Sequence, residues 1–250
     1  RVGATEPILA FNADVPRNPA SVIKLVTTFA ALEALGPAYQ WRTEAYVDGR
    51  MEGGTLTGDL LLKGYGDPYL VTERLWLLQR ELRNRGLRVI DGDLVIDNSW
   101  FAREELDPGA FDGQAYRAYN ALPDALLVNY QAVNFTFRPD AGRGRVEILA
   151  DPVLANLEVK NEMRLFRGGC GSAKSGISMV VGSTPSRPRV TFSGALASQC
   201  AEYQLLRSIL DGPAYAYGAF RGLWEEQGGQ ITGGVRQGQV PAGKSPLVTF

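Results

Sequence analysis

Residues 21–35 constrain the fold most, because this segment is apolar on nearly every side of a helix. Gly36 and Pro37 follow it as a helix stop signal. Only Lys24, two threonines and Glu33 interrupt the apolar positions. A helix that is hydrophobic all round is normally buried. We therefore expect residues 21–35 to lie inside a domain. A charged lysine side chain is unusual in such a place, so the presence of Lys24 has to be explained.

Ser21 and Lys24 are three positions apart, so they share one face of this helix with about 5 to 6 Å between their Cβ atoms. The Lys24 amine can therefore reach the Ser21 hydroxyl. At a helix N-terminus, free backbone N–H groups and the positive end of the dipole favour an alkoxide and a substrate oxyanion. A lysine among apolar side chains gives up its proton more readily. Ser21 is thus a candidate nucleophile and Lys24 its base.

The chain contains no histidine, which excludes Ser-His-Asp and Cys-His sites and His-ligated zinc. Nucleophilic catalysis needs another base here. Ser-x-x-Lys is a weak pattern by itself, and the alternative is an N-cap serine followed by a solvated lysine. The context favours catalysis, because the motif occurs once and opens a long apolar helix directly after a proline-containing turn.

Composition narrows the class of protein further. The 250 residues are 45% hydrophobic and 21% charged with a formal net charge of -1, so we expect peptide or small polar ligands and no nucleic acid. The length predicts more than one domain. No run approaches the roughly 20 apolar residues of a membrane span. The start at Arg1 without a signal-peptide pattern is what we expect of a mature or trimmed protein.

Cys170 and Cys200 are separated by 30 positions and suit one disulfide. Such a bridge would stabilise the fold by about 3 to 4 kcal/mol and favours an oxidising compartment. Two unpaired buried thiols are the alternative, since cysteine is a common core residue. We expect no metal site and no cofactor.

The remaining pattern predicts mixed α and β structure. Besides the helix at 21–35, helices are expected at 73–85 and 214–227, and each is followed by a glycine that ends it. Short strands and many glycines mark residues 134–200 as a β-rich insertion. The other predicted strands are at 8–11, 43–47, 55–63, 94–97 and 231–237, with 135–138 and 145–149 inside the insertion.

Several segments resemble, in order, the serine D-Ala-D-Ala carboxypeptidase/endopeptidase family of the penicillin-binding protein 4 type. The nucleophile segment is NPASVIKLVTT at residues 18–28. Further similar segments are GDL at 58–60 running to GYGDP at 64–68, IDGDLVID at 90–97 with Ser99 and Phe101, and YNALPDAL at 119–126 up to Asn129. The resemblance is specific from residue 19 to residue 129 and weaker after residue 134.

This resemblance implies an α+β fold in which a penicillin-recognising domain, like that of serine transpeptidases and β-lactamases, is interrupted by a second domain that carries a third. Residues 1–44 would begin the catalytic domain. Residues 45–133 and 201–245 would form an α/β second domain, with 134–200 as the β-rich third domain. Residues 246–250 would begin the return to the catalytic domain.

The resemblance also implies a Ser-x-Asn motif and a Lys-Thr-Gly strand, and residues 1–250 contain neither. We expect both beyond Phe250, and we expect residues 1–250 alone to be inactive. Lys174-Ser175-Gly176 imitates the Lys-Thr-Gly strand but falls in the β-rich insertion. In the family, the second domain contacts the side chain of the substrate peptide near Asp112 and Tyr119, although a surface carboxylate is the default interpretation of Asp112.

Two other features have plain structural explanations. Gly64, Gly66 and Asp67 could form a phosphate-cradling loop, but no Gly-Lys-Ser follows, so a tight turn is favoured. Trp76, Trp100 and the remaining aromatic residues are expected in the core.

Together these observations predict a periplasmic or otherwise extracytoplasmic serine carboxypeptidase that acts on peptidoglycan stem peptides and is acylated at Ser21 by β-lactams. One alternative is a non-catalytic peptidoglycan-binding or scaffolding protein of the same fold. The other is a β-lactamase. The oligomeric state is left open by the sequence.

Overall fold

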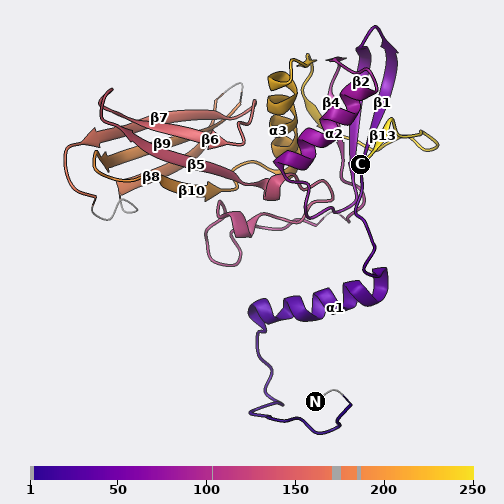
Figure 1. The fold of residues 1–250 in the computed structure, drawn as a ribbon, viewed down its shortest axis with the longest axis vertical. Helices are drawn as coiled ribbons and strands as arrows, with labels where there is room; N and C mark the ends of the chain where they lie inside the picture. Colours follow the sequence, from indigo (N-terminus) through magenta and orange to yellow (C-terminus); the bar gives the residue numbers. More distant parts are fainter. Residues whose placement is uncertain (1–2, 103, 171–175, 185–186) are drawn as a thin grey trace. The chain divides into compact units, whose positions relative to one another are not determined.

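A computed structural model describes residues 3–102, 104–170, 176–184 and 187–250. The chain divides into two compact units, Arg1–Gln40 and Trp41–Phe250. Helices and several β-sheets are combined, as Figure 1 shows, so the predicted α+β class is confirmed. None of the described helices is both long enough and apolar enough to cross a membrane.

The first unit is built around α1 (Ile23–Leu35), and the 3-10 turn η1 (Ala20–Val22) leads directly into it. The helix ends where the Gly36 N–H donates to the Leu32 carbonyl over 2.9 Å. Its predicted extent is confirmed. The strand predicted at residues 8–11 is wrong, since no strand occurs among the described residues before η1. A single strand without a neighbour has no ladder of hydrogen bonds to stabilise it.

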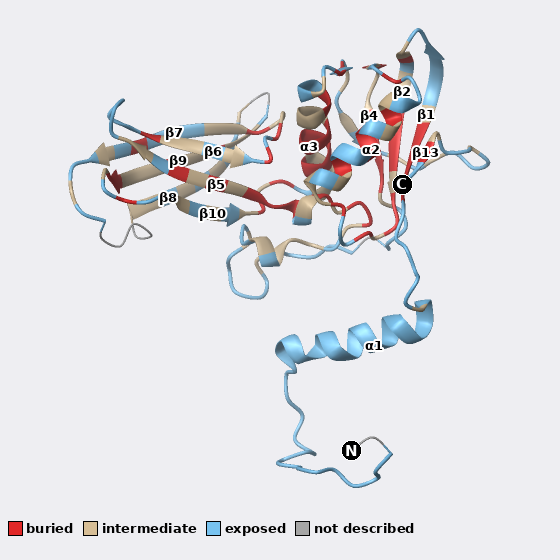
Figure 2. Cartoon of the chain, in the orientation of Figure 1, coloured by how far each residue is buried: buried red, intermediate tan, exposed pale blue. Residues whose placement is uncertain are grey.

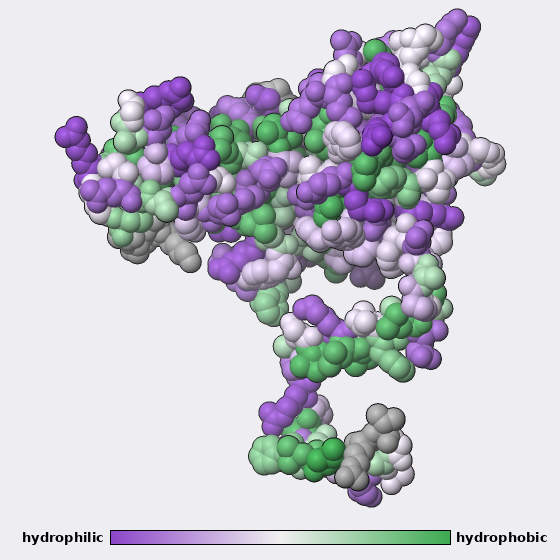
Figure 3. Space-filling view, viewed as in Figure 1, coloured by the Kyte–Doolittle hydropathy of each residue, from purple (hydrophilic) through white to green (hydrophobic). Residues whose placement is uncertain are grey.

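The predicted burial of α1 is also wrong for this chain. Figure 2 shows the helix exposed along its length, and Leu25 and Phe29 are 72% and 66% exposed. Apolar side chains gather along the face of α1 seen in Figure 3. Beyond η1 and α1, the described residues of this unit lie in turns and irregular segments. Such segments offer no apolar layer against which the helix could pack.

The second unit contains a mixed sheet centred on β2 (Thr55–Gly64). An antiparallel hairpin joins β2 to β1 (Thr43–Glu52). On its other side, β2 pairs in parallel with β3 (Val89–Asp91) near its beginning and with β4 (Leu94–Asp97) near its end. Three consecutive leucines of β2, Leu60, Leu61 and Leu62, are buried, so the strand is covered on both faces of the sheet.

Three short strands from the end of the chain complete this sheet. β11 (Gln230–Ile231) pairs with β3, and β12 (Val235–Gln237) pairs with β4, both in parallel. The single strand predicted at 231–237 is therefore divided in two. Gly233 lies at the break, where its N–H donates to the Gly92 carbonyl over 3.0 Å and a side chain would meet the same oxygen at 2.2 Å. β13 (Val248–Thr249) pairs antiparallel with β1. The last residues, expected to begin a return to another domain, thus extend this sheet.

Two helices, α2 (Thr72–Asn84) and α3 (Gly212–Glu226), lie together against the sheet in Figure 1. The buried residues of α2 recur at helical spacing, at Leu75, Leu78, Gln79 and Leu82. The Gln79 amide donates to the Phe220 carbonyl of α3 over 2.7 Å.

Tryptophans divide between core and surface. Trp224 of α3 is fully buried, whereas Trp76 and Trp100 are 41% and 58% exposed. The prediction that these two lie in the core is wrong. Trp76 is not among the buried residues of α2. Trp100 follows β4 and makes an edge contact with the ring of Tyr65, with ring centroids 5.0 Å apart.

Residues between β4 and α3 form a β-sandwich preceded by two 3-10 turns, η2 (Ala118–Asn120) and η3 (Asn129–Gln131). One sheet has the order β10-β5-β6 and the other β7-β9-β8. Phe135 and Phe137 of the first sheet both contact Phe192 of the second, with centroids 4.8 and 5.0 Å apart. The strands are β5 (Val133–Asp140), β6 (Arg145–Asp151), β7 (Glu158–Phe166), β8 (Ile177–Ser183), β9 (Pro188–Ala197) and β10 (Tyr203–Arg207).

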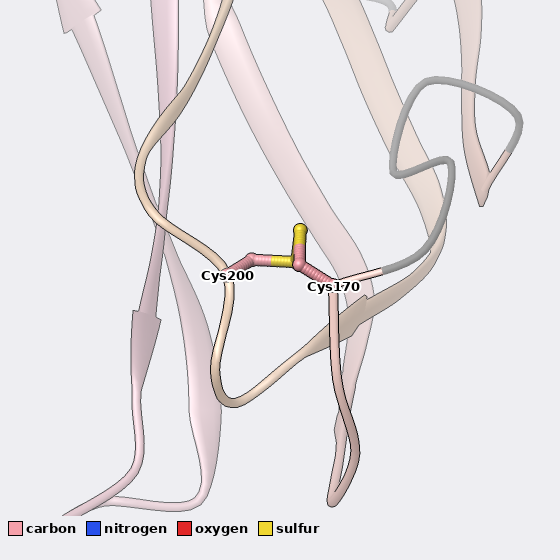
Figure 4. Close-up of a disulfide and its surroundings, with 2 residues drawn as sticks. All are labelled: Cys170 and Cys200. Atoms are coloured by element: carbon pink, nitrogen blue, oxygen red, sulfur yellow. A yellow bond between two sulfur atoms is a disulfide. The ribbon is translucent and has the colours of Figure 1, made fainter.

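The predicted β-rich character of residues 134–200 is confirmed, and the sandwich also includes β10 beyond that boundary. Cys170, after β7, and Cys200, after β9, are joined by a disulfide with Cα atoms 4.7 Å apart (Figure 4). The bridge ties together the ends of two neighbouring strands.

Candidate active site

The Lys24 amine donates to the Ser21 hydroxyl, with Nζ and Oγ 3.1 Å apart. Ser21 lies in η1 and Lys24 in the first turn of α1. The two elements follow one another without a break, so the three-residue spacing places both side chains on one face. The structure thus brings together the serine and the lysine that the spacing predicts.

The backbone before Ser21 forms a tight turn that determines where the helix begins. The Asn18 carboxamide accepts from the Ala20 N–H over 2.9 Å, and the Val22 N–H donates to the Pro19 carbonyl over 3.0 Å. Ala20 has a φ of 45°, which few residues other than glycine adopt. Ser21 consequently stands directly after a constrained turn, at the start of the helical segment.

Asp112 and Tyr119 belong to the second unit and contact one another. The Tyr119 hydroxyl donates to one oxygen of the Asp112 carboxylate. The other oxygen accepts from the Asn120 carboxamide over 2.8 Å and from the Gln114 N–H over 2.9 Å. Both residues are exposed, and the Arg117 guanidinium lies 5.7 Å from the centre of the Tyr119 ring.

This hydrogen bonding shifts both titrating groups. The Tyr119 hydroxyl chiefly holds the pKa of Asp112 below its ordinary value, assisted by the Gln114 N–H and the Asn120 amide. The same bond to a carboxylate raises the pKa of Tyr119. At neutral pH the cluster presents an ionised carboxylate and a neutral phenol.

Asn120 and Gln114 complete this cluster, and the sequence did not predict their part in it. The bond from the Gln114 N–H to Asp112 is an Asx turn, and the Asp112-Gly113 pair is a recognisable signal for it. The contribution of Asn120 depends on how η2 folds back towards Asp112, so no local pattern predicts it.

The glycine-rich segment at 64–68 is a structural turn. The Gly66 N–H donates to the Ala125 carbonyl over 2.8 Å, and the Asp67 carboxylate accepts from the Tyr69 N–H over 2.9 Å. Asp67 is buried. The N–H groups of Gly66 and Tyr69, which a phosphate would need as donors, are thus already bonded within the protein.

Of the Lys174-Ser175-Gly176 sequence, Lys174 and Ser175 lie outside the described residues. Gly176 directly precedes β8, which pairs with β9 in the sandwich. Among the residues that the structure describes, no group of histidine, cysteine, aspartate or glutamate side chains could hold a metal ion.

Several known proteins are similar to this chain in sequence. The profile of the D-Ala-D-Ala carboxypeptidase 3 (S13) family matches residues 1–250. A D-alanyl-D-alanine carboxypeptidase from Actinomadura sp. (strain R39) is 31% identical over 233 residues, which are 90% of this chain and 42% of that protein. D-alanyl-D-alanine carboxypeptidase DacB from Haemophilus influenzae is 26% identical over 240 residues, covering 96% of this chain and 49% of the relative.

Solved structures show the same fold. The crystal structure of penicillin binding protein 4 (dacB) from Haemophilus influenzae matches with a TM-score of 0.72 and 24% identity, over 97% of this chain and 53% of that one. A second crystal structure of that protein, complexed with a β-lactam, matches with a TM-score of 0.63 and 22% identity, over 93% of this chain and 49% of that one.

The chain spans about half the length of the curated relatives it matches. The family profile nevertheless covers all of the sequence, including the Ser21 to Lys24 segment. The resemblance inferred from residues 18–129 is thereby confirmed. This chain belongs to the D-Ala-D-Ala carboxypeptidase 3 (S13) family.

Proposed function

We propose that this protein is a serine-type D-alanyl-D-alanine carboxypeptidase or endopeptidase that acts on peptidoglycan stem peptides outside the cytoplasm. The observation that carries the proposal is the 3.1 Å hydrogen bond between Lys24 and Ser21, at the helix start, in a member of this family. A serine needs an adjacent base to act as a nucleophile. Lys24 is the side chain in position to supply it.

The proposed reaction proceeds through an acyl-enzyme. In its neutral form, Lys24 takes the Ser21 hydroxyl proton while Oγ attacks the carbonyl carbon of the D-Ala-D-Ala bond. The backbone N–H of Ser21 helps to hold the oxyanion. The proton passes to the leaving amine of D-alanine as the peptide bond breaks. A water molecule then hydrolyses the ester, which releases the shortened peptide and regenerates Ser21.

β-Lactams are proposed as covalent inhibitors at the same residue. The related penicillin binding protein 4 has been crystallised in complex with a β-lactam. The lactam carbonyl would acylate Ser21, and the ring C–N bond would open in place of the peptide bond. Both reactions require the same serine and lysine.

Asp112 and Tyr119 are proposed to contact the side chain of the stem peptide. Diamino acids in such peptides carry an ammonium group, and an exposed carboxylate with a lowered pKa stays ionised to bind it. The bonds from Tyr119 and Asn120 hold that carboxylate in one orientation.

The nested domain organisation is part of the proposal. Residues 1–44 would belong to the penicillin-recognising domain, residues 45–133 and 201–245 to the second domain, and residues 134–200 to the third. The sandwich supports this arrangement because its strands are continuous in sequence between β4 and α3. The pairing of β13 with β1 favours a later boundary than residue 245 for the second domain.

Release of D-alanine tests the proposed function. We expect the protein, in the full length that its gene encodes, to release D-alanine from a peptide ending in D-Ala-D-Ala. Ser21→Ala should lower the rate about a thousandfold or more, because it removes the nucleophile. Ser245→Ala, at an exposed position, is the matched control and should keep the original rate. Unchanged release by the Ser21 variant would refute the assignment.

A further inference from the structure

One edge of the β-sandwich contains a hollow of about 380 Å³ beneath the loop that precedes η2. Edge strands of both sheets meet there, β10 from one and β8 from the other. Ile177, Met179 and Leu205 supply apolar lining, and Arg117 and Arg207 also line it. We call this hollow the two-arginine pocket.

The backbone fixes the two arginines beside one another. Arg117 and Arg207 form an isolated antiparallel bridge, and the next residue, Ser208, donates its N–H to the Tyr116 carbonyl over 3.0 Å. Residues directly opposite in an antiparallel pair project to the same face. Tyr203 and Leu205 share that face of β10 with Arg207, because side chains alternate along a strand. Both arginines therefore line the same hollow.

Neither arginine is neutralised by an ion pair with a described carboxylate. Arg207 Nη1 donates to the carbonyl of Leu206 over 2.8 Å, and Arg117 lies over the ring of Tyr119. Asp112 attracts Arg117 only through space. Burial lowers the pKa of Arg207, Tyr203 acts to raise it, and the positive charge of Arg117 lowers it further. Two neighbouring cations that repel one another are stabilised when an anion binds beside them.

We propose that the two-arginine pocket binds a carboxylate or phosphate group carried by a small, partly apolar molecule. Guanidinium groups match both anions in geometry as well as charge. The apolar lining would receive the hydrocarbon part of the ligand, and the volume falls in the usual range of roughly 300 to 1,000 Å³ for ligand sites. This inference goes beyond the proposed function, since the groups proposed to bind the anion are Arg117 and Arg207 and not Ser21, Lys24, Asp112 or Tyr119.

Phenyl phosphate and benzoate are suitable probes, because they share an apolar ring and differ in the anion. We expect isothermal titration of the full-length protein at low salt to detect binding, with benzyl alcohol as a neutral control that does not bind. Arg207→Gln should weaken binding about tenfold or more, as expected for loss of a charged hydrogen-bonding partner. Arg50→Gln removes the same charge at an 80% exposed side chain and should leave the affinity unchanged.

Arg207→Lys keeps the charge but loses the fork of donors, so its affinity should lie between those of the wild type and Arg207→Gln. Amide chemical shifts should move at residues 114–117 and 203–207 in the wild type, which locates binding even if Arg207→Gln folds poorly. Tighter binding of phenyl phosphate assigns a phosphate-bearing ligand, and tighter binding of benzoate assigns a carboxylate. No binding of either probe by the wild type, or equal affinities for the Arg207→Gln and Arg50→Gln variants, would overturn the proposal.

Discussion

Asp97, at the end of β4, is a fully buried carboxylate whose partners come from three parts of the second unit. One oxygen accepts from the hydroxyl and the N–H of Ser99, over 2.6 and 3.1 Å. The other accepts from the Val240 N–H over 2.8 Å and lies 3.2 Å from the Lys63 amine. These contacts connect β2, β4 and the segment after β12, so Asp97 holds the sheet together from within.

Replacement of Asp97 by asparagine should destabilise the protein by about 3 kcal/mol at neutral pH, because the partly buried Lys63 amine loses its counter-ion and asparagine has one accepting oxygen where the buried carboxylate uses two. The free energy of unfolding in urea measures this loss. Asp91→Asn is the matched control, since Asp91 is exposed and an amide oxygen can still accept from Thr232. Equal effects of the two substitutions would contradict the structural role of Asp97.

The same carboxylate predicts a dependence on pH. Burial acts to raise the pKa of Asp97, but hydrogen bonds from Ser99 and Val240 and the Lys63 amine outweigh it and lower the pKa below 3.8. A lowered folded-state pKa stabilises the fold above the unfolded value and ceases to do so as pH falls through the folded one. The stability difference between wild type and Asp97→Asn should therefore be complete above pH 3.8 and shrink below it. A difference that stays constant into acid would exclude ionisation as its source.

Local spacing made Ser21 and Lys24 predictable, because residues three apart on a helix meet whatever surrounds them. Buried acids such as Glu44 were not predictable. The hydroxyls of Tyr46 and Tyr65 both donate to Glu44, and Tyr65, which directly follows β2, is 21 positions away in the sequence. A partner distant in sequence leaves no local pattern.

At the scale of elements, α3 illustrates how close packing positions the sandwich against the helical layer. The Gly218 carbonyl accepts from the Ala155 N–H over 3.1 Å, and the Asn156 carboxamide donates to the Ala214 carbonyl over 2.9 Å. A side chain at Gly222 would meet the Val153 carbonyl oxygen at 2.6 Å. Because Gly222 has no side chain, the backbone of the loop between β6 and β7 can lie directly against α3.

Gly222→Ala should therefore destabilise the protein by about 1 to 3 kcal/mol, even though alanine favours a helix. The loop backbone would have to move away from α3. Thermal or urea unfolding measures the effect. Gly182→Ala, on β8 with no atom within 4 Å of the added carbon, is the control and should change stability little. If Gly222→Ala left the stability unchanged or raised it, the loop between β6 and β7 would be able to move away from α3 without destabilising the protein, which would contradict this prediction.

Periodicity and glycine signals located most elements to within a few residues, including α2, α3 and the strands around β2. Burial was harder to predict. The pattern of α1 predicts a core helix, yet its side chains are exposed in this chain, because periodicity describes a helix and not its surroundings. The break between β11 and β12 likewise reflects their pairing with two separate strands, β3 and β4, which lie far away in the sequence.

At the scale of the whole molecule, the chain joins a unit that carries Ser21 and Lys24 to a larger unit built from a sheet, two helices and a β-sandwich. Composition and motif order predicted this mixed architecture and the β-rich region. The pairing of β10 with the sandwich and of β13 with β1 was not predicted, since strand partners depend on long-range register rather than on local sequence.

We propose that Ser21 is a nucleophile activated by Lys24. Mass spectrometry of the full-length protein after incubation with benzylpenicillin tests it most directly. We expect the peptide containing Ser21 to gain the mass of one intact penicillin molecule, and Lys24→Gln to slow this gain by about a hundredfold or more because the base is lost. Lys160→Gln, on β7, should acylate at the original rate. An adduct on another residue, or equal rates for the Lys24 and Lys160 variants, would contradict the claim.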